Sequence, residues 1–171
     1  GQGMLEEFAK YSPVPVINGL SDLYHPCQIL TDLFTIQEAQ KDFSKKKIAY
    51  VGDGNNMANS WIVASYLLKF PLSIATPKGY EPPAEILRQF DGSFQMTHDP
   101  MEAVRGADVV NTDTWFSMGQ DEDKAKRAAF AGFQVNDRLL GQAKRDAIVL
   151  HCLPAHRGEE ITDEVLDGPQ S

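Results

Sequence analysis

The amino-acid sequence predicts an α/β fold, a doubly wound parallel sheet with helices on both faces (Rossmann-like). Short apolar runs alternate with segments whose apolar residues recur at helical spacing, at intervals of about 20 to 40 residues. This alternation is typical of βαβ units with right-handed crossovers. With 171 residues, 42% of them hydrophobic, the chain is long enough for one domain with a buried core.

The first elements follow from β-branched runs and helical periodicity. Residues 14–17 are short and β-branched and are followed by Asn18-Gly19, which predicts a strand and a turn. Residues 26–41 carry apolar side chains at helical spacing, so a helix is expected there. A strand at 48–51 and a helix at 59–70 come next.

The middle of the chain continues the alternation. A strand is expected at 72–75, and Pro82-Pro83 opens a helix that runs to about residue 90, because the first helical turn tolerates proline. Residues 94–96 favour a further strand, Asp99-Pro100 caps a short helix to residue 105, and 107–110 is the next strand.

The last third predicts two helices, a strand and a final short helix. The helices are expected at 121–130 and 136–143, the strand at 147–150, and the short helix at 162–166. Parallel sheets hold ligands at the carboxyl ends of their strands. Polar segments directly after two of the predicted strands therefore indicate a site.

Composition excludes several function classes. A net charge of −8 argues against nucleic acid or an anionic membrane as the main partner, and the basic run Lys45-Lys46-Lys47 is interpreted as a solvated loop. The two cysteines, Cys27 and Cys152, are far apart in the sequence, which disfavours a metal knuckle and indicates a reduced, cytoplasmic setting. No apolar stretch reaches 18 residues, so a membrane span is not expected.

The strongest competing interpretation is a dinucleotide site at Gly52-Asp53-Gly54. This loop joins a strand to a helix as a Rossmann fingerprint does, but Met57 replaces the third glycine and Thr76 to Lys78 replaces the expected acidic residue. A tight turn accounts for both glycines. The amides of Asn55 and Asn56 exceed what a turn requires and could bind an amino acid.

The polar segments each have a structural and a functional interpretation. Asp113 and Ser117 could cap a turn and a helix, although Met118 and the glycine after it suit a loop that contacts a ligand. Cys152 could be a small buried hydrophobe, but it stands where a strand ends, between His151 and Leu153-Pro154. His25 and Gln28 form a polar helix start that suits an anionic or carbonyl oxygen.

Five motifs resemble ornithine carbamoyltransferase, in the same order and over essentially the whole chain. The Ser-Met-Gly loop separates that family from its aspartate-carbamoylating relatives. The five motifs lie at residues 20–28, 52–56, 75–82, 112–119 and 151–154. The resemblance implies that residues 1–25 end a carbamoyl phosphate domain and form a hinge, and that 26–171 form an ornithine-binding domain, the second of two, incomplete at its C-terminus.

The resemblance also implies an activity and its residues. Family members transfer the carbamoyl group of carbamoyl phosphate to the δ-amine of L-ornithine, giving L-citrulline and phosphate without a metal or organic cofactor. His25, Gln28, Cys152 and Leu153 would bind carbamoyl phosphate, with His25 and Cys152 catalytic. The ornithine-binding residues would be Asn56, Asp113, Ser117 and Met118.

The match also has departures. The family's Ser-Thr-Arg-Thr phosphate loop and a later arginine are not in this sequence. A dianionic phosphate needs several donors and cations, so we expect the 171 residues alone to lack turnover. The resemblance implies that they supply the ornithine-binding half of an enzyme that is a homotrimer at full length. Two alternatives stay open at this point. One is a non-catalytic amino-acid-binding module or truncated paralogue, and the other is a dinucleotide-dependent enzyme.

Overall fold

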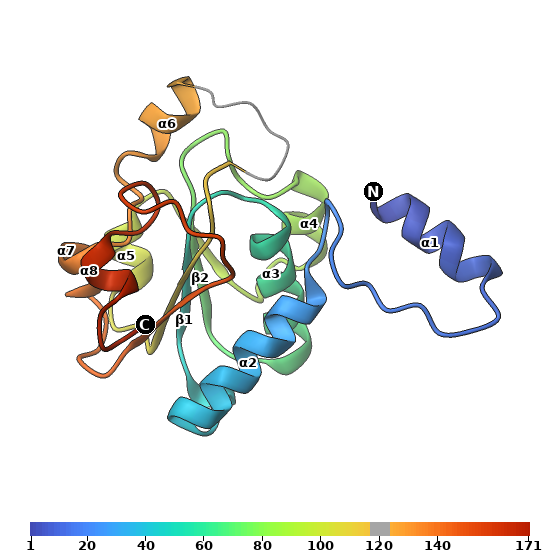
Figure 1. The fold of residues 1–171 in the computed structure, drawn as a ribbon, viewed down its shortest axis with the longest axis horizontal. Helices are drawn as coiled ribbons and strands as arrows, with labels where there is room; N and C mark the ends of the chain where they lie inside the picture. Colours follow the sequence, from blue (N-terminus) through green and yellow to red (C-terminus); the bar gives the residue numbers. More distant parts are fainter. Residues whose placement is uncertain (117–123) are drawn as a thin grey trace.

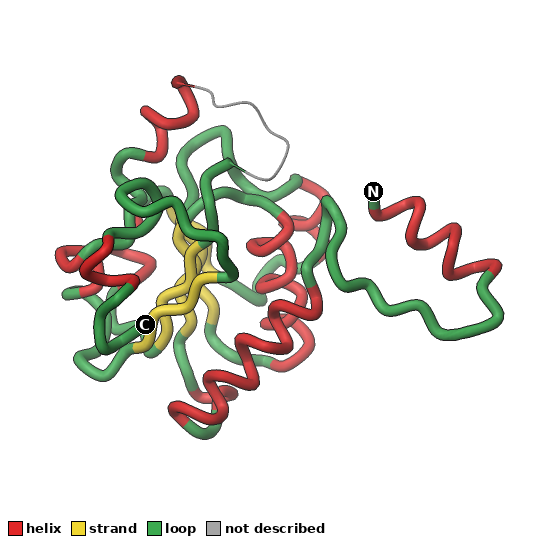
Figure 2. The backbone as a smooth tube through the Cα atoms, in the orientation of Figure 1, coloured by secondary structure: helices red, strands yellow, loops and turns green. Residues whose placement is uncertain are grey.

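The computed structural model, which describes residues 1–116 and 124–171, confirms the α/β fold with a parallel sheet (Figures 1 and 2). In the described residues, five strands pair in the order β3-β2-β1-β4-β5, all parallel. Both neighbours of the central strand therefore follow it in the chain, which places the reversal of strand order between β1 and β4. The strands are β1 (Ile48–Val51), β2 (Leu72–Ala75), β3 (Gln95–Thr97), β4 (Val109–Thr112) and β5 (Ile148–His151).

Helices cover both faces of the sheet, as the sequence predicts. The helices α2 (Pro26–Gln40), α3 (Asn56–Leu68) and α4 (Ala84–Gln89) bury apolar residues in one cluster with Tyr50 and Ile74. The helices of the opposite face are α5 (Pro100–Val104), α6 (Lys124–Phe130), α7 (Asp137–Leu140) and α8 (Asp163–Leu166). Successive strand residues alternate between the two cores, since Val109 belongs to the first and Val110 to the second.

Helix α1 (Gln2–Tyr11), for which the sequence made no prediction, buries none of its residues and lies apart from the sheet (Figure 1). Its first turn is tied to the segment before α2, because the Gln2 amide donates to Asp22 at 2.7 Å. The Ser21 hydroxyl also donates to the Gln2 side chain at 2.8 Å. A ten-residue helix without tertiary packing gains little stability in water.

The strand predicted at 14–17 is wrong. These residues are irregular, and Val14 and Ile17 are exposed. Pro13 and Pro15 have no amide N–H to donate to a ladder, so the run cannot join the sheet as a central strand.

Several predicted boundaries also move. The helix predicted at 136–143 is shorter, Asp137–Leu140, and the strands predicted at 94–96 and 147–150 each begin and end one residue later. The strand predicted at 107–110 is β4, Val109–Thr112, and so begins two residues later. Asp108 still belongs to the preceding loop, where its carboxylate accepts the Lys47 amide at 2.9 Å. The helix predicted at 59–70 begins at Asn56, where the side chain of Asn55 accepts the Met57 amide at 2.9 Å. Within the described residues, no helix is long and apolar enough to cross a membrane.

Candidate functional site

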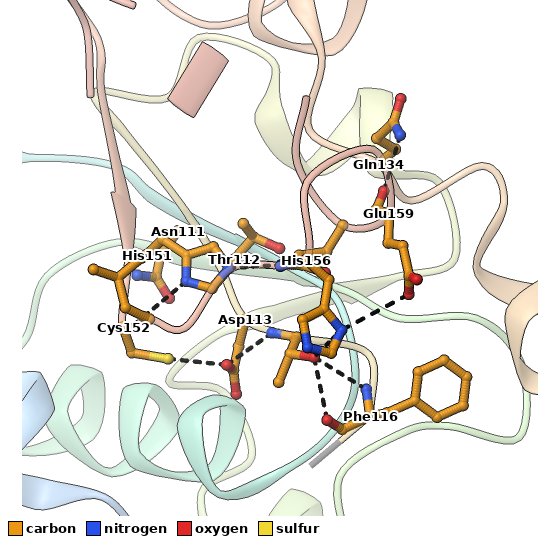
Figure 3. A network of polar contacts seen from close by, with 12 residues as sticks. Asn111, Thr112, Asp113, Phe116, Gln134, His151, Cys152, His156 and Glu159 are labelled. Carbon is orange, nitrogen blue, oxygen red and sulfur yellow. Dashed lines mark hydrogen bonds and ion pairs between the residues drawn. The ribbon is translucent and has the colours of Figure 1, made fainter. Parts of the chain in front are cut away.

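Asp113 and Cys152 form the centre of the site at the carboxyl ends of two neighbouring strands (Figure 3). Thr112 and His151 are the last paired residues of β4 and β5. The residues that follow them, Asp113 and Cys152, therefore lie side by side. The Cys152 thiol donates to Oδ1 of Asp113 at 2.9 Å. The sheet register thus places a carboxylate against a thiol.

Two further donors hold the Asp113 carboxylate. Oδ1 also accepts the Thr114 amide at 2.8 Å, and Oδ2 accepts Nδ2 of Asn55 at 2.7 Å. Asp113 is only 7% exposed, so these bonds replace the water that a carboxylate would otherwise bind. A nearly buried carboxylate with ordered donors is suited to hold a cation such as an amino group.

The environment of Cys152 keeps its thiol protonated. Burial raises the pKa of the Cys152 thiol well above its ordinary value, and the neighbouring Asp113 carboxylate raises it further by charge and by hydrogen bonding. A reactive thiolate needs the opposite environment, with nearby cations. Cys152 is therefore built as a hydrogen-bond donor rather than a covalent nucleophile.

A buried imidazole and carboxylate shape the turn after β5. The amide of Leu153 donates to Nδ1 of His151 at 2.9 Å, so the ring proton is on Nε2, which lies 3.0 Å from Oε1 of Glu160. Glu160 is fully buried and also accepts the His156 amide at 2.6 Å. These contacts hold Leu153 at φ 58°, a conformation that a leucine rarely adopts.

The loop after β1 supports the site rather than a nucleotide. A Cβ at Gly54 would collide with the backbone of Glu81 and Pro82, and the Gly54 amide donates to the Tyr80 carbonyl at 2.8 Å. The second glycine of the loop is thus required by a neighbouring segment of the same chain. The hypothesis of a tight turn is supported, and the loop offers no further evidence for dinucleotide binding.

The loop also carries a largely buried ion pair. Asp53 lies 2.6 Å from Nζ of Lys126 on α6, and burial raises the pKa of the Asp53 carboxyl although Lys126 opposes the rise. The Tyr50 hydroxyl lies 2.9 Å from the Asp53 carbonyl. Burial, with Asp113 and Asp53 nearby, raises the Tyr50 pKa well above its usual value, so this hydroxyl stays a neutral donor.

His25 is the N-cap of α2, and Gln28 lies in the first turn of the same helix. The His25 amide donates to Oγ of Ser60 at 2.7 Å, and its ring Nδ1 is buried without a partner. The side-chain Nε2 of Gln28 donates to Oδ1 of Asp32 at 2.9 Å. Asp32 is only 4% exposed, and burial raises its pKa to about 6, against the Gln28 hydrogen bond and His151, which lower it.

Of the remaining predicted residues, the structure describes Asn56 and Leu153. Asn56 donates to the Ser21 carbonyl at 2.9 Å, so its amide faces the segment that precedes α2. Leu153 is exposed at the turn after Cys152. Ser117 and Met118 lie outside the described residues.

The sequence missed two supporting residues, Asp32 and Glu160, and it indicated Asn55 only as an amide that could bind an amino acid. Asn55 stands one residue before α3, where the capping rule gives a signal for an N-cap but none for its contact with Asp113. Asp32 follows Gln28 by four residues, the spacing at which helix side chains meet, and this signal could have found it. Glu160 lies in an irregular segment that offers no sequence signal.

Among the described residues, one group could offer three ligands to a metal ion: His156, Glu159 and Glu160. The Arg127 guanidinium already lies 2.6 Å from the Glu159 carboxylate, and its positive charge disfavours a metal cation beside it. The two acidic side chains are thus engaged in contacts within the chain, and we assign them no ligand.

Comparison with known proteins agrees with this arrangement. The family model described as aspartate/ornithine carbamoyltransferase, Asp/Orn binding domain, matches residues 44–171, and the model of the carbamoyl-P binding domain matches residues 1–38. The ornithine carbamoyltransferase of Geobacter metallireducens is 56% identical over 176 residues, and that of Syntrophus aciditrophicus is 56% identical over 173. These matches cover 100% and 98% of this chain but 58% and 57% of the relatives.

Solved structures give the same result. The ornithine carbamoyltransferase of Burkholderia thailandensis matches with a TM-score of 0.91 at 44% identity, over 99% of this chain and 55% of that one. The anabolic ornithine carbamoyltransferase of Campylobacter jejuni matches with a TM-score of 0.92 at 44% identity, over 96% and 57%. The chain thus spans a little more than half the length of these relatives, and it belongs to the aspartate/ornithine carbamoyltransferase family.

Proposed function

We propose that this chain supplies the ornithine-binding half of an enzyme that carbamoylates the δ-amine of L-ornithine, with L-citrulline and phosphate as products. The observation that carries the proposal is the contact between the Cys152 thiol and the Asp113 carboxylate at the carboxyl edge of the sheet. The names of the similar proteins agree with it.

Asp113 is proposed to hold an ammonium group of ornithine, together with Asn56, Ser117 and Met118. A carboxylate favours the charged form of an amine beside it, so Asp113 suits the α-ammonium or the proton released in the reaction. An amine with a pKa of about 10.4 is neutralised near pH 7.4 at a cost of roughly 4 kcal/mol. The site therefore has to accept a proton or select the rare neutral form.

The δ-nitrogen attacks the carbamoyl carbon, a C–N bond forms, the C–O bond to phosphate breaks, and the amine loses a proton. His25 would stabilise the developing oxyanion by hydrogen bonding. Gln28 would bind the carbamoyl group, and Leu153 would offer its backbone carbonyl. The protonated Cys152 thiol, whose pKa is raised by burial and by Asp113, would lie near the attacking amine while it donates to Asp113.

We also propose the domain division, the assembly and the location. Helix α2 buries Ile29, Leu33 and Ile36, whereas α1 buries no residue, which supports a division between 1–25 and 26–171. The longer protein would be a homotrimer. Cys27 and Cys152 are free thiols, which favours the cytoplasm.

The test is a ligand-observed NMR titration of L-ornithine against the purified chain, which detects millimolar affinity. We expect binding by the parent chain and at least tenfold weaker binding by Asp113→Asn, since a carboxylate–ammonium contact contributes about 1.5–3 kcal/mol. The matched control is Asp91→Asn, the same change at an exposed position. Equal binding by all three proteins would contradict the assignment of Asp113.

A further inference from the structure

Asn55 makes more contacts than an N-cap requires. Its Oδ1 accepts the amides of Met57 at 2.9 Å and Ala58 at 3.4 Å, and it lies 3.2 Å from the Tyr50 hydroxyl. Its Nδ2 donates to Oδ2 of Asp113 at 2.7 Å. The helix amides require the oxygen on their side, so the nitrogen is fixed toward Asp113.

The contact with Asn55 decides how the Asp113 carboxylate lies. Oδ1 accepts both the Cys152 thiol and the Thr114 amide, whereas Oδ2 accepts Asn55. Rotation of the carboxylate about its Cβ–Cγ bond would break all three bonds. Asn55 is hydrogen-bonded both to the first turn of α3 and to Asp113. The position of that helix therefore determines where the carboxylate lies.

We propose that Asn55 is a positioning residue that holds the Asp113 carboxylate with Oδ1 on the Cys152 thiol. The role extends the proposed function, because Asp113 is the group we propose to hold ornithine. A serine or threonine at this position would keep an N-cap oxygen but would lack the amide donor. Such variants separate positioning from helix capping.

The first measurement is the S–H stretching band of Cys152, by infrared or Raman spectroscopy. A Cys27→Ser background leaves Cys152 as the only thiol in the sequence. A hydrogen bond to a carboxylate lowers the stretching frequency, and one to a neutral amide lowers it less. We expect Asn55→Ser and Asn55→Thr to shift the band to higher frequency, in the same direction as Asp113→Asn.

The matched control is Asn136→Ser, the same substitution at the N-cap of α7. Asn136 accepts the Leu139 amide at 3.1 Å, and its Nδ2 donates to Gln134, so neither atom contacts Asp113 or Cys152. We expect this variant to leave the S–H band of Cys152 unchanged. A band that is also unchanged in folded Asn55→Ser and Asn55→Thr would overturn the proposal and leave Asn55 as a cap only.

The second measurement is the affinity for L-ornithine. We expect Asn55→Ser to weaken binding at least about tenfold, the loss expected when a hydrogen bond to a charged group is removed, while Asn136→Ser binds as the parent does. Ornithine binding by Asn55→Ser at the parent affinity would also count against the proposal. A parent chain that binds no ornithine would contradict the proposed function, whereas the S–H band would still decide the role of Asn55.

Discussion

Asp32 gives a prediction in which the sign and the size both follow from burial. The side chain lies on α2, is 4% exposed, and has Oδ2 buried without a hydrogen-bond partner. Burial raises its pKa from an ordinary value of 3.8 to about 6, although the Gln28 hydrogen bond and His151 act in the opposite direction. The ionised form is thus less favourable in the folded chain than in the unfolded chain.

Between about pH 4 and pH 6 the folded state binds a proton at Asp32 that the unfolded state has released, so the free energy of unfolding falls as the pH rises. At 1.36 kcal/mol per unit, this shift corresponds to about 3 kcal/mol, fully expressed above the folded-state pKa. Asp32→Asn keeps an oxygen for Gln28 and cannot ionise. The difference in free energy of unfolding between Asp32→Asn and the parent should therefore change by about 3 kcal/mol in favour of the variant from pH 4 to pH 7.5.

The assay is urea unfolding at several pH values between 4 and 8, followed by tryptophan fluorescence and far-UV circular dichroism. Asp91→Asn, at an exposed position, is the matched control for a changed net charge. Asp32→Asn and the parent showing parallel pH profiles would refute the reasoning. A stability difference that shrinks as the pH rises would refute it as well, because it would mean that the folded state favours the carboxylate.

Two further predictions concern the loop after β1 and the thiol. Gly54→Ala should lower the free energy of unfolding by about 1–3 kcal/mol, because its Cβ would collide with the Glu81–Pro82 backbone; an unchanged urea midpoint would contradict this. Cys152 should react with iodoacetamide much more slowly in the folded chain at pH 8.5 than in urea, since burial and Asp113 raise its pKa. Equal rates, measured by peptide mass spectrometry, would show that the thiol is neither buried nor paired as described.

The sequence predicted the sheet well because buried parallel strands carry continuous apolar runs. Residues 48–51 and 72–75 match β1 and β2, and both strands are buried along their whole length. The run at 14–17 is also short and rich in β-branched residues, but it follows Pro13, contains Pro15 and lies outside the core, and its burial cannot be read from the local pattern. Tertiary contacts, not local pattern, decide which apolar run joins the sheet.

The site was predictable where it follows from strand ends. Asp113 and Cys152 each follow a recognisable strand, and parallel pairing brings such residues together. Asn55 and Asp32 reach the site from helices, and their contacts depend on how those helices pack on the sheet. Asn56, the amide chosen from the sequence, faces the segment before α2, because neighbouring helix positions point in different directions.

The pairing of β4 with β5 has a consequence for how this site can vary among related proteins. Thr112 and His151 are register partners, so the spacing between Asp113 and Cys152 is set by the backbone hydrogen bonds between β4 and β5. Residues inserted beyond the turn at Leu153 would lengthen a surface connection and leave that spacing intact. One residue inserted within β5 would turn its side chains to the opposite face and separate the thiol from the carboxylate. Ligand preference at the proposed site can therefore diversify through the connecting segments while the contact between Asp113 and Cys152 stays constant.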